Sequence, residues 1–297
     1  MIEKSYAAAL KFIADGEAKE AGIAVGTRAA EAVLAKRMND GSKEVDTYRP
    51  HTSAGNYVPT TIPAVPHWTN RKPWLMKTSS QFRPGAPPAL NSKQWARDFM
   101  EVKNIGRLDS AQRSQQQTEI AKFWEATLPP IYHGVVHSVA AQTGRSVTEN
   151  ARLFALITQG ADDALIAVFD AKYHHGFWRP ITAIRNADID GNDDTERDAT
   201  WQPFIPTPMH PEYPCAHCVV AGTVGAILKA EMGSLPMPVL STSSVTANGV
   251  TRSWPSVDEF VQEVSDARIY DGVHYRTSAE VGTAMGISIG ENTVDKF

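Results

Sequence analysis

Three short segments concentrate residue types that could bind and process a small anion. The first, KYHHGFWRP, contains Lys172 and, seven residues later, Arg179. The third, ARIYDGVHYRTS, contains Arg268 and, six residues later, His274. Read singly, such residues are usually surface cations or satisfied core histidines. Together, the three cations match a dianionic or trianionic tetrahedral oxyanion, and each Arg offers it bidentate geometry.

The second segment, MHPEYPCAHC, leads from a Pro-rich loop into the small and apolar run VVAGTVGAIL, which is typical of a helix start. The backbone N–H groups of Cys215, Ala216 and His217 would then face outward at the positive end of the helix dipole, where an oxyanion binds well. His217 would stand beside that anion and could give or take a proton near neutral pH. The three segments therefore predict an oxyanion site with acid–base chemistry.

The ordered set Lys172-x6-Arg179-Pro180, Pro214-Cys-Ala-His217 and Arg268-x5-His274 resembles a known three-part signature. It is the signature of the superfamily of vanadium-dependent haloperoxidases and type 2 phosphatidic acid phosphatases. The segments DAKYHHGFWRPITAIR and IPTPMHPEYPCAHC are most similar to the soluble branch related to vanadium chloroperoxidase. The resemblance runs from about residue 7 to the C-terminus. Members of this branch usually have further helical sequence before this point, so we expect an N-terminal portion to be absent.

The resemblance implies a helical bundle that holds vanadate, with phosphate able to occupy the same site. His217 matches the family's acid/base histidine, and His274 matches the axial vanadium ligand, which is the nucleophile in the phosphatases. His210 matches a position that faces the halide or substrate, and we expect Trp178 to line the same pocket. The residues that match the oxyanion-binding positions are Lys172, Arg179, Cys215, Ala216 and Arg268.

Four positions depart from the family pattern, one of which is Ala267 in place of the Ser that usually precedes the Arg. Cys215 replaces a Ser, and a thiol is a weaker hydrogen-bond partner that should have a lowered pKa here and that peroxide can oxidise. Ala216 replaces a Gly and keeps the backbone N–H. Ser278 stands where the signature has an Asp that orients the histidine ligand, so it could hold the ring of His274 but adds no negative charge.

The leading hypothesis is a vanadium-dependent haloperoxidase-like enzyme that uses hydrogen peroxide to oxidise a halide, which then reacts with a small organic substrate. The first alternative is an acid phosphatase acting on phosphomonoesters in the same pocket, with His274 attacking phosphorus. The second alternative is an oxyanion-binding homologue that has lost catalysis. Vanadate and phosphate are nearly isosteric, so these hypotheses stay open at the level of the sequence.

Other motifs carry weaker signals. Cys215 and Cys218 form a CxxC at a helix start, but no βαβ pattern surrounds them, as a thioredoxin-like pair would require. His133 and His137 could share one helix face and bind a metal, although no third ligand is evident. The acidic run 188–194 lacks the spacing of a calcium-binding EF-hand loop, so we interpret it as a solvated turn.

The elements that must position these motifs are predicted to be helices. A capping box from Ser146 to Glu149 opens the strongest helix, which Gly176 should end. A second capping box begins at Ser256, and further helices are expected within residues 7–35, around 95–102 and around 115–124. Alternating patterns of strand length are scarce. We therefore expect an all-α helical bundle that forms a single domain over residues 1–297.

Long Pro-rich connections should join these helices. Eight of the 19 prolines lie between Pro50 and Pro88, where neither a long helix nor a central strand is plausible. The aromatic residues of this stretch favour an arm over 46–92 that packs on the bundle over a disordered linker. Five more prolines lie between Pro203 and Pro214, and they predict an extended loop before the second motif.

Composition excludes several classes of protein. The 297 residues carry 29 Lys plus Arg and 33 Asp plus Glu, a formal net charge of −4, so the global basic character of a nucleic-acid binder is missing. Two cysteines cannot form a disulfide framework. With neither a membrane-spanning apolar run nor a signal peptide in this chain, we expect a soluble protein of unknown compartment. A homo-oligomer is compatible with this sequence.

Overall fold

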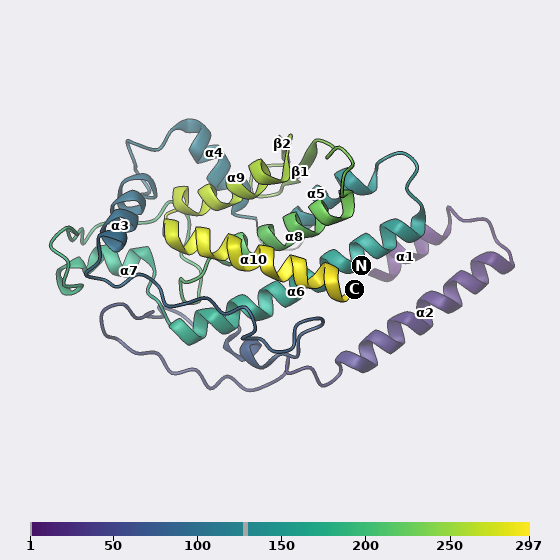
Figure 1. Ribbon diagram of the computed structural model, residues 1–297, viewed down its shortest axis with the longest axis horizontal. Coiled ribbons are helices and arrows are strands. Elements are labelled where there is room, and N and C mark those ends of the chain that lie inside the picture. Colours follow the sequence, from purple (N-terminus) through teal and green to yellow (C-terminus); the bar gives the residue numbers. More distant parts are fainter. Residues whose placement is uncertain (1, 127–129) are drawn as a thin grey trace. The chain divides into compact units, whose positions relative to one another are not determined.

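The computed structural model describes residues 2–126 and 130–297, which form a mainly helical protein (Figure 1). This confirms the predicted fold class. Two short 3-10 helices, η1 (Pro66–Asn70) and η2 (Ala187–Ile189), lie in connections. None of the described helices is both long and apolar enough to cross a membrane. The α-helices are α1 (Ile2–Leu10), α2 (Glu17–Arg37), α3 (Lys93–Ile105), α4 (Gln115–Trp124), α5 (Pro130–Ala140), α6 (Val147–His175), α7 (Pro180–Arg185), α8 (Ala216–Met232), α9 (Val257–Tyr270) and α10 (Arg276–Lys296).

The chain divides into two compact units, residues 1–43 and 44–297. The first unit contains α1 and α2, which residues 11–16 separate. None of the residues in these two helices, as described, is buried. The candidate site lies entirely in the second unit. A single domain over residues 1–297 stays a prediction.

The second unit is organised around α8, which contacts α6, α9 and α10 (Figure 1). Glycines let α8 and α10 approach until their backbones touch. A Cβ atom added at Gly286 would collide with the carbonyl oxygen of Val219, and one added at Gly222 would lie 2.5 Å from the carbonyl oxygen of Thr283. Side chains larger than hydrogen are therefore excluded along this seam, which fixes where α10 begins relative to α8.

Helix α6 ends where it can deliver the first motif. Both hydrogen bonds of the predicted capping box are present between Ser146 and Glu149, and Gly176 ends the helix in the left-handed conformation with φ of 57°. The predicted helix is therefore confirmed at both ends. Lys172 lies in its last turn and is fully buried.

The Pro-rich segment 46–92 is attached to α6 by carboxylates. Asp163 accepts hydrogen bonds from three consecutive backbone N–H groups, those of residues 74–76, at 2.7 to 3.0 Å. Asp170 pairs with Arg83, with 2.7 Å between Nε and Oδ2. A backbone hydrogen bond from Tyr57 to Gly176 joins the segment to the end of the same helix. The segment therefore braces the helix that carries Lys172.

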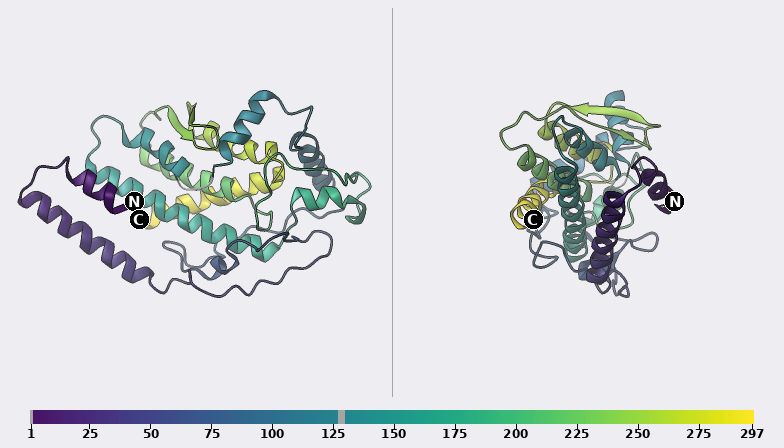
Figure 2. Two further views of the ribbon diagram at one scale, coloured as in Figure 1. Left: turned by 180° about the vertical axis from the view of Figure 1, so that it is seen from behind. Right: turned by 90° about the vertical axis from the view of Figure 1, so that its right-hand side faces the viewer.

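A two-stranded antiparallel hairpin is an element that the sequence analysis did not predict. It consists of β1 (Leu240–Ser244) and β2 (Val250–Trp254), with Leu240 opposite Trp254, and α5 contacts β1 (Figure 2). The turn contains Asn248 and Gly249, whose φ values of 53° and 79° suit a type I′ turn. This Asn-Gly pair is the local signal that could have revealed the hairpin.

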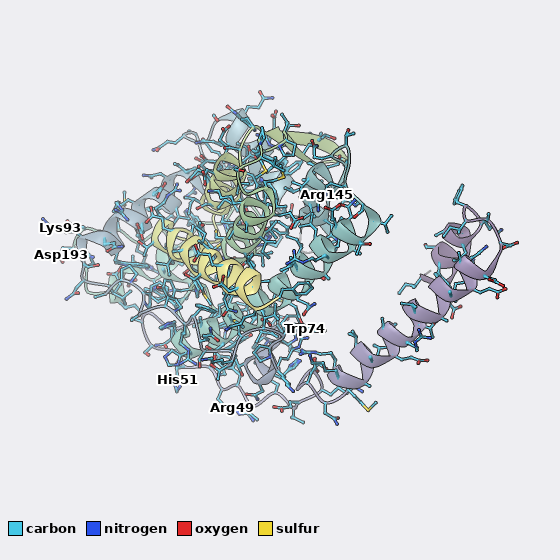
Figure 3. The ribbon with its side chains drawn as sticks, turned by 45° about the vertical axis from the view of Figure 1, so that its right-hand side comes forward. Arg49, His51, Trp74, Lys93, Arg145 and Asp193 are labelled. Atoms are coloured by element: carbon cyan, nitrogen blue, oxygen red, sulfur yellow. The ribbon has the colours of Figure 1, made fainter. Side chains whose placement is uncertain are left out.

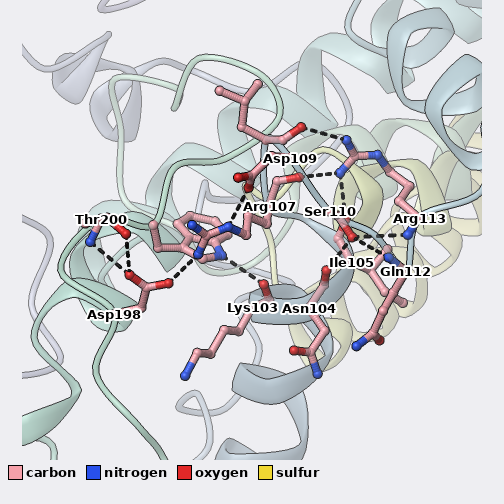
Figure 4. Close-up of polar contacts among 12 residues, drawn as sticks. Lys103, Asn104, Ile105, Arg107, Asp109, Ser110, Gln112, Arg113, Asp198 and Thr200 are labelled. Atoms are coloured by element: carbon pink, nitrogen blue, oxygen red, sulfur yellow. Dashed lines mark hydrogen bonds and ion pairs between the residues drawn. The ribbon is translucent and has the colours of Figure 1, made fainter.

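A polar network fixes the loop between α3 and α4 (Figure 4). Arg107 forms an ion pair with Asp198, which also accepts hydrogen bonds from the backbone and hydroxyl of Thr200 at 2.9 and 2.8 Å. Arg113 donates to the carbonyl oxygens of Ile105 and Arg107 at 2.7 and 2.6 Å. The loop is thereby tied to the segment that precedes the second motif.

The acidic run 188–194 forms a loop against the start of α3. The Asn192 side chain donates to the carbonyl oxygens of Leu90 and Ser92 at 2.7 and 3.1 Å. Figure 3 shows Lys93 and Asp193 next to each other at this end of the unit. Within the described parts of the chain, no group of three or more His, Cys, Asp or Glu side chains could hold a metal ion. The run is thus a loop with a structural role.

Candidate functional site

Four helix ends bring the three motifs together. Arg179 is the N-cap of α7, which follows the end of α6, and Cys215 is the N-cap of α8. Arg268 lies in the last turn of α9, and His274 lies in the short connection to α10. The predicted start of a helix at Cys215 is confirmed. Residues up to about one hundred positions apart therefore converge because their helices end in the same place.

Lys172 and Arg179 are buried cations whose donors point at main-chain oxygens. The Lys172 Nζ donates to the carbonyl oxygens of Pro211 and Glu212 at 3.0 and 2.7 Å. The Arg179 guanidinium donates to the carbonyl oxygens of His210 and Val273 at 2.9 and 2.8 Å. Burial, followed by the neighbouring charge of Arg179, lowers the pKa of Lys172, so a bound anion would favour its charged form.

Arg268 is the third buried cation and carries its own counterion. Its guanidinium forms an ion pair with Asp271, three residues later, and donates to the carbonyl oxygen of Trp124 at 3.0 Å. Burial raises the pKa of Asp271 to about 7, against the opposing effect of the Arg268 charge. The Arg268 Nε has no hydrogen-bond partner among the described residues. The sequence analysis did not single out Asp271, although its spacing from Arg268 is that of neighbours on one helix face.

His274 is fully buried and is held at both ring nitrogens. Its Nδ1 lies 2.6 Å from the Oε1 atom of Glu212, and its Nε2 lies 3.2 Å from the Arg179 guanidinium. Arginine has no acceptor, so Nε2 must carry the lone pair and Nδ1 must carry the proton that Glu212 accepts. Burial lowers the pKa of His274 well below its ordinary value, and the charge of Arg179 acts in the same direction. The ring is therefore neutral, with Nε2 facing the cations.

Glu212 is the functional residue that the sequence analysis missed. Its Oε1 atom accepts the Nδ1 proton of His274 and also the backbone N–H of Tyr275 at 3.1 Å. Burial raises the pKa of Glu212 to about 7, although the charges of Lys172 and Arg179 oppose the shift. One feature of the sequence could have drawn attention to Glu212. It is the sole acidic side chain between residues 199 and 230.

The structure gives His274 a different partner from the Ser278 that the sequence predicts. The Ser278 hydroxyl is buried beside the Glu212 carboxyl, whose pKa it acts to lower, and it is not one of the partners of the His274 ring. Its backbone carbonyl instead accepts the N–H of Cys215 at 3.1 Å. Ser278 therefore fixes the start of α8, while Glu212 orients the histidine.

His217 is the second residue of α8 and lies in the first turn of that helix. Its backbone carbonyl accepts the hydroxyl of Tyr132 at 3.1 Å, and its Nε2 is buried without a partner among the described residues. Burial, followed by the charge of Arg268, lowers the pKa of His217 well below its ordinary value. The ring is neutral at pH 7 and can accept a proton.

The two residues expected to line a substrate or halide pocket lie in different surroundings. His210 contacts Arg179, with 3.0 Å between Nδ1 and the guanidinium, and its ring meets Phe169 edge-on. Trp178 is buried and stacks on Trp95 at 5.9 Å between ring centroids, inside an aromatic cluster. His210 therefore contacts the cationic residue Arg179, whereas Trp178 packs inside an aromatic core cluster.

His133 and His137, which the sequence placed on one helix face, lie on α5. Their ring centroids are 5.8 and 5.0 Å from that of Phe154 on α6. Both histidines are therefore helical, as the sequence analysis expects.

Comparison with known proteins identifies the architecture. Residues 152–297, which hold all three motifs, match the family model described as the VCPO second helical-bundle domain. The chain is related to the vanadium haloperoxidases. The vanadium chloroperoxidase of Curvularia inaequalis is 23% identical over 310 residues, which cover 79% of this chain and 50% of that protein. The chain thus spans about half the length of this curated relative.

Solved vanadium haloperoxidase structures share the fold. A bacterial vanadium-dependent iodoperoxidase superposes with a TM-score of 0.76 at 26% identity, over 92% of this chain and 68% of its own. A holo-type bacterial vanadium-dependent chloroperoxidase superposes with a TM-score of 0.75 at 17% identity, over 91% of this chain and 71% of its own. Both superpositions therefore cover more of this chain than residues 152–297, which the family model matches.

Proposed function

We propose that the protein is a vanadium-dependent haloperoxidase that uses hydrogen peroxide to oxidise a halide. The single observation that carries this proposal is the neutral His274, whose Nδ1 is held by Glu212 and whose Nε2 faces the buried Arg179, with the charges of Lys172 and Arg268 also acting on the ring. A lone pair presented to a positively charged pocket suits an anionic metal centre better than it suits a neutral substrate.

The charges of the site fit vanadate. Lys172, Arg179 and Arg268 supply three buried cationic groups, whereas Asp271 and Glu212 are carboxyls whose pKa values are raised to about 7 by burial. When Lys172 is charged, one positive charge remains even with both carboxyls ionised. The unpartnered Nε of Arg268 adds a donor that no described protein group uses. A dianionic or trianionic oxyanion would satisfy both the charge and the donor.

The residues of the chain would divide the work as follows. Lys172, Arg179 and Arg268 would hold the oxyanion oxygens, together with the backbone N–H groups at the start of α8. His274 would offer its Nε2 as a ligand once the Arg179 guanidinium turns from it to the anion. When bound, vanadate supplies a Lewis acid that activates hydrogen peroxide toward a halide. His217 would accept a proton from the incoming peroxide at Nε2, because its lowered pKa keeps the ring neutral.

A halide-dependent oxidation assay tests the proposal. The protein is stripped of metal, reloaded with vanadate and given hydrogen peroxide, a phenolic dye and iodide, bromide or chloride in separate reactions. We expect halogenation of the dye that requires the halide, the vanadate and His274. The matched control is His133→Ala, since His133 lies on α5 beside Phe154. If vanadate-loaded protein is no faster than metal-free protein with all three halides, the proposal is wrong.

An acid phosphatase acting on phosphomonoesters is the second candidate, because the same Nε2 lone pair is oriented for attack on phosphorus. Hydrolysis of a phosphomonoester that vanadate inhibits, and that is lost in His274→Ala, would favour this reaction. Calorimetry with inorganic phosphate separates both enzymes from an oxyanion-binding homologue without catalysis. In that case phosphate binds, and neither reaction is observed.

A further inference from the structure

Two thiols meet at the start of α8, inside the oxyanion site. The Sγ atoms of Cys215 and Cys218 lie 2.6 Å apart, and both cysteines are free and fully buried. The backbone N–H of Cys218 also points at the Cys215 Sγ, at 3.4 Å. Neither thiol has a part in the proposed reaction.

Helix geometry explains why the two thiols touch. Cys215 is the N-cap of α8 and Cys218 is three residues later, the two positions whose side chains each reach the other's backbone N–H in a capping box. Helix α10 then encloses them, because a Cβ added at Gly282 would lie 2.7 Å from the Cys215 carbonyl oxygen and 3.1 Å from the Cys218 Cβ. The helix start and the close approach of α10 therefore keep the two cysteines next to each other.

The surroundings make the two thiols unequal. Burial alone would raise the pKa of Cys215, but the hydrogen bond from Cys218 and the charge of Arg268 outweigh it, so the pKa is lowered. Burial and the hydrogen bond with Cys215 raise the pKa of Cys218. One nucleophilic sulfur beside one protonated thiol is the usual arrangement of a CxxC redox pair.

We propose that Cys215 and Cys218 form a peroxide-responsive dithiol that hydrogen peroxide converts into a disulfide within the oxyanion site. In the first step the Cys215 sulfur attacks peroxide, so that an S–O bond forms, the O–O bond breaks and one water leaves. In the second step the Cys218 sulfur attacks the sulfenic acid, so that the S–S bond forms, the S–O bond breaks and a second water leaves. Peroxide takes up the two electrons that the sulfurs lose.

The pair would protect a site that handles peroxide. A lone sulfenic acid is oxidised further to sulfinic and sulfonic acids, which no thiol reductant reverses, whereas a disulfide is reduced back by a dithiol. The partner thiol at Cys218 therefore turns an irreversible loss at Cys215 into a reversible one. This inference requires only peroxide and the two thiols, so it stands separately from halide oxidation.

Mass spectrometry of the intact full-length protein tests the inference. After treatment with hydrogen peroxide, the wild type should lose two hydrogen atoms, lose both alkylatable thiols, and recover them with dithiothreitol. Cys218→Ser should instead form a Cys215 sulfenic acid that reacts with dimedone, and then gain two or three oxygen atoms irreversibly. Cys215→Ser should keep its Cys218 thiol, because the more nucleophilic sulfur is gone. If the folded wild type gains oxygen atoms as Cys218→Ser does, or keeps both thiols, the proposed pair is wrong.

Competition with an anion tests the route to the thiols. Cys215 is fully buried near the charges of Arg268 and Lys172, so we expect peroxide to reach it by way of the proposed oxyanion site. Saturating inorganic phosphate should therefore slow disulfide formation severalfold, and sodium nitrate at equal ionic strength should not. Equal rates in both salts would overturn the placement of the pair in the pocket. Because thiol content is the readout, the result is independent of whether the enzyme oxidises halides.

Discussion

The Glu212 carboxylate and the His274 imidazole form a buried pair, with 2.6 Å between Oε1 and Nδ1. Sixty-two residues separate them in sequence. The carboxylate fixes the proton on Nδ1 and leaves Nε2 as a lone pair toward Arg179. A carboxylate that orients a histidine ligand commonly accounts for a 10- to 100-fold effect, roughly, on metal affinity or activity.

Glu212→Gln should therefore lower halide oxidation by roughly 10- to 100-fold, since the amide keeps the size but not the charge. The measurement is kcat/KM with saturating vanadate, together with the vanadate concentration that gives half-maximal activity. Ser278→Ala is the comparison variant, and it should change both quantities less. If Ser278→Ala lowers kcat/KM more than Glu212→Gln does, Ser278 rather than Glu212 orients the histidine.

Asp271→Asn should destabilise the fold by about 3 kcal/mol, because it leaves the buried Arg268 without its counterion. Urea unfolding measures the change. The control is Asp258→Asn, which removes the exposed ion pair with Lys229 and should change stability by less than about 1 kcal/mol. Inorganic phosphate should stabilise Asp271→Asn more than the wild type, because the anion replaces the lost charge. If Asp271→Asn and Asp258→Asn lose the same amount of unfolding free energy, the Asp271 carboxylate does not compensate the charge of Arg268.

Gly286→Ala should destabilise the protein by about 3 kcal/mol, because its Cβ would collide with the Val219 backbone of α8 and neither helix can yield. Thermal and urea unfolding report the effect. Gly85→Ala is the matched control, since no atom lies within 4 Å of a Cβ added there. If the two alanine variants were equally stable, close backbone contact between α8 and α10 would not hold in solution.

Asp198 should make stability depend on acid pH. The hydroxyl and the backbone of Thr200, followed by Arg107, lower the pKa of Asp198 to about 2. A carboxyl whose pKa is lowered by folding stabilises the fold fully above its ordinary pKa. That stabilisation is then lost as the pH falls from about 4 to about 2. Asp198→Asn should make the free energy of unfolding depend less on pH in this window. The control is Asp193→Asn at an exposed position, in which the free energy of unfolding should change with pH as it does in the wild type.

Local sequence signals predicted the helices and the motif residues. Ser146 with Glu149, and Gly176 at the other end, mark α6 within a few residues of each terminus, so short-range hydrogen bonding decides these boundaries. The hairpin had a local signal too, in Asn248 and Gly249, but its Ser- and Thr-rich strands have little apolar alternation. Its pairing depends on packing against α5, which is distant in the chain.

The sequence by itself determined the helical class, the helix ends and the cationic and imidazole groups that gather at the site. The tertiary structure alone decided which buried charges meet. His274 could have been held by Ser278, four residues away, but the fold brings Glu212 to it from the loop before α8. The physical reason is that local hydrogen bonds fix a helix end. A buried charge, in contrast, must find its counterion wherever the packing of α6, α8, α9 and α10 excludes water.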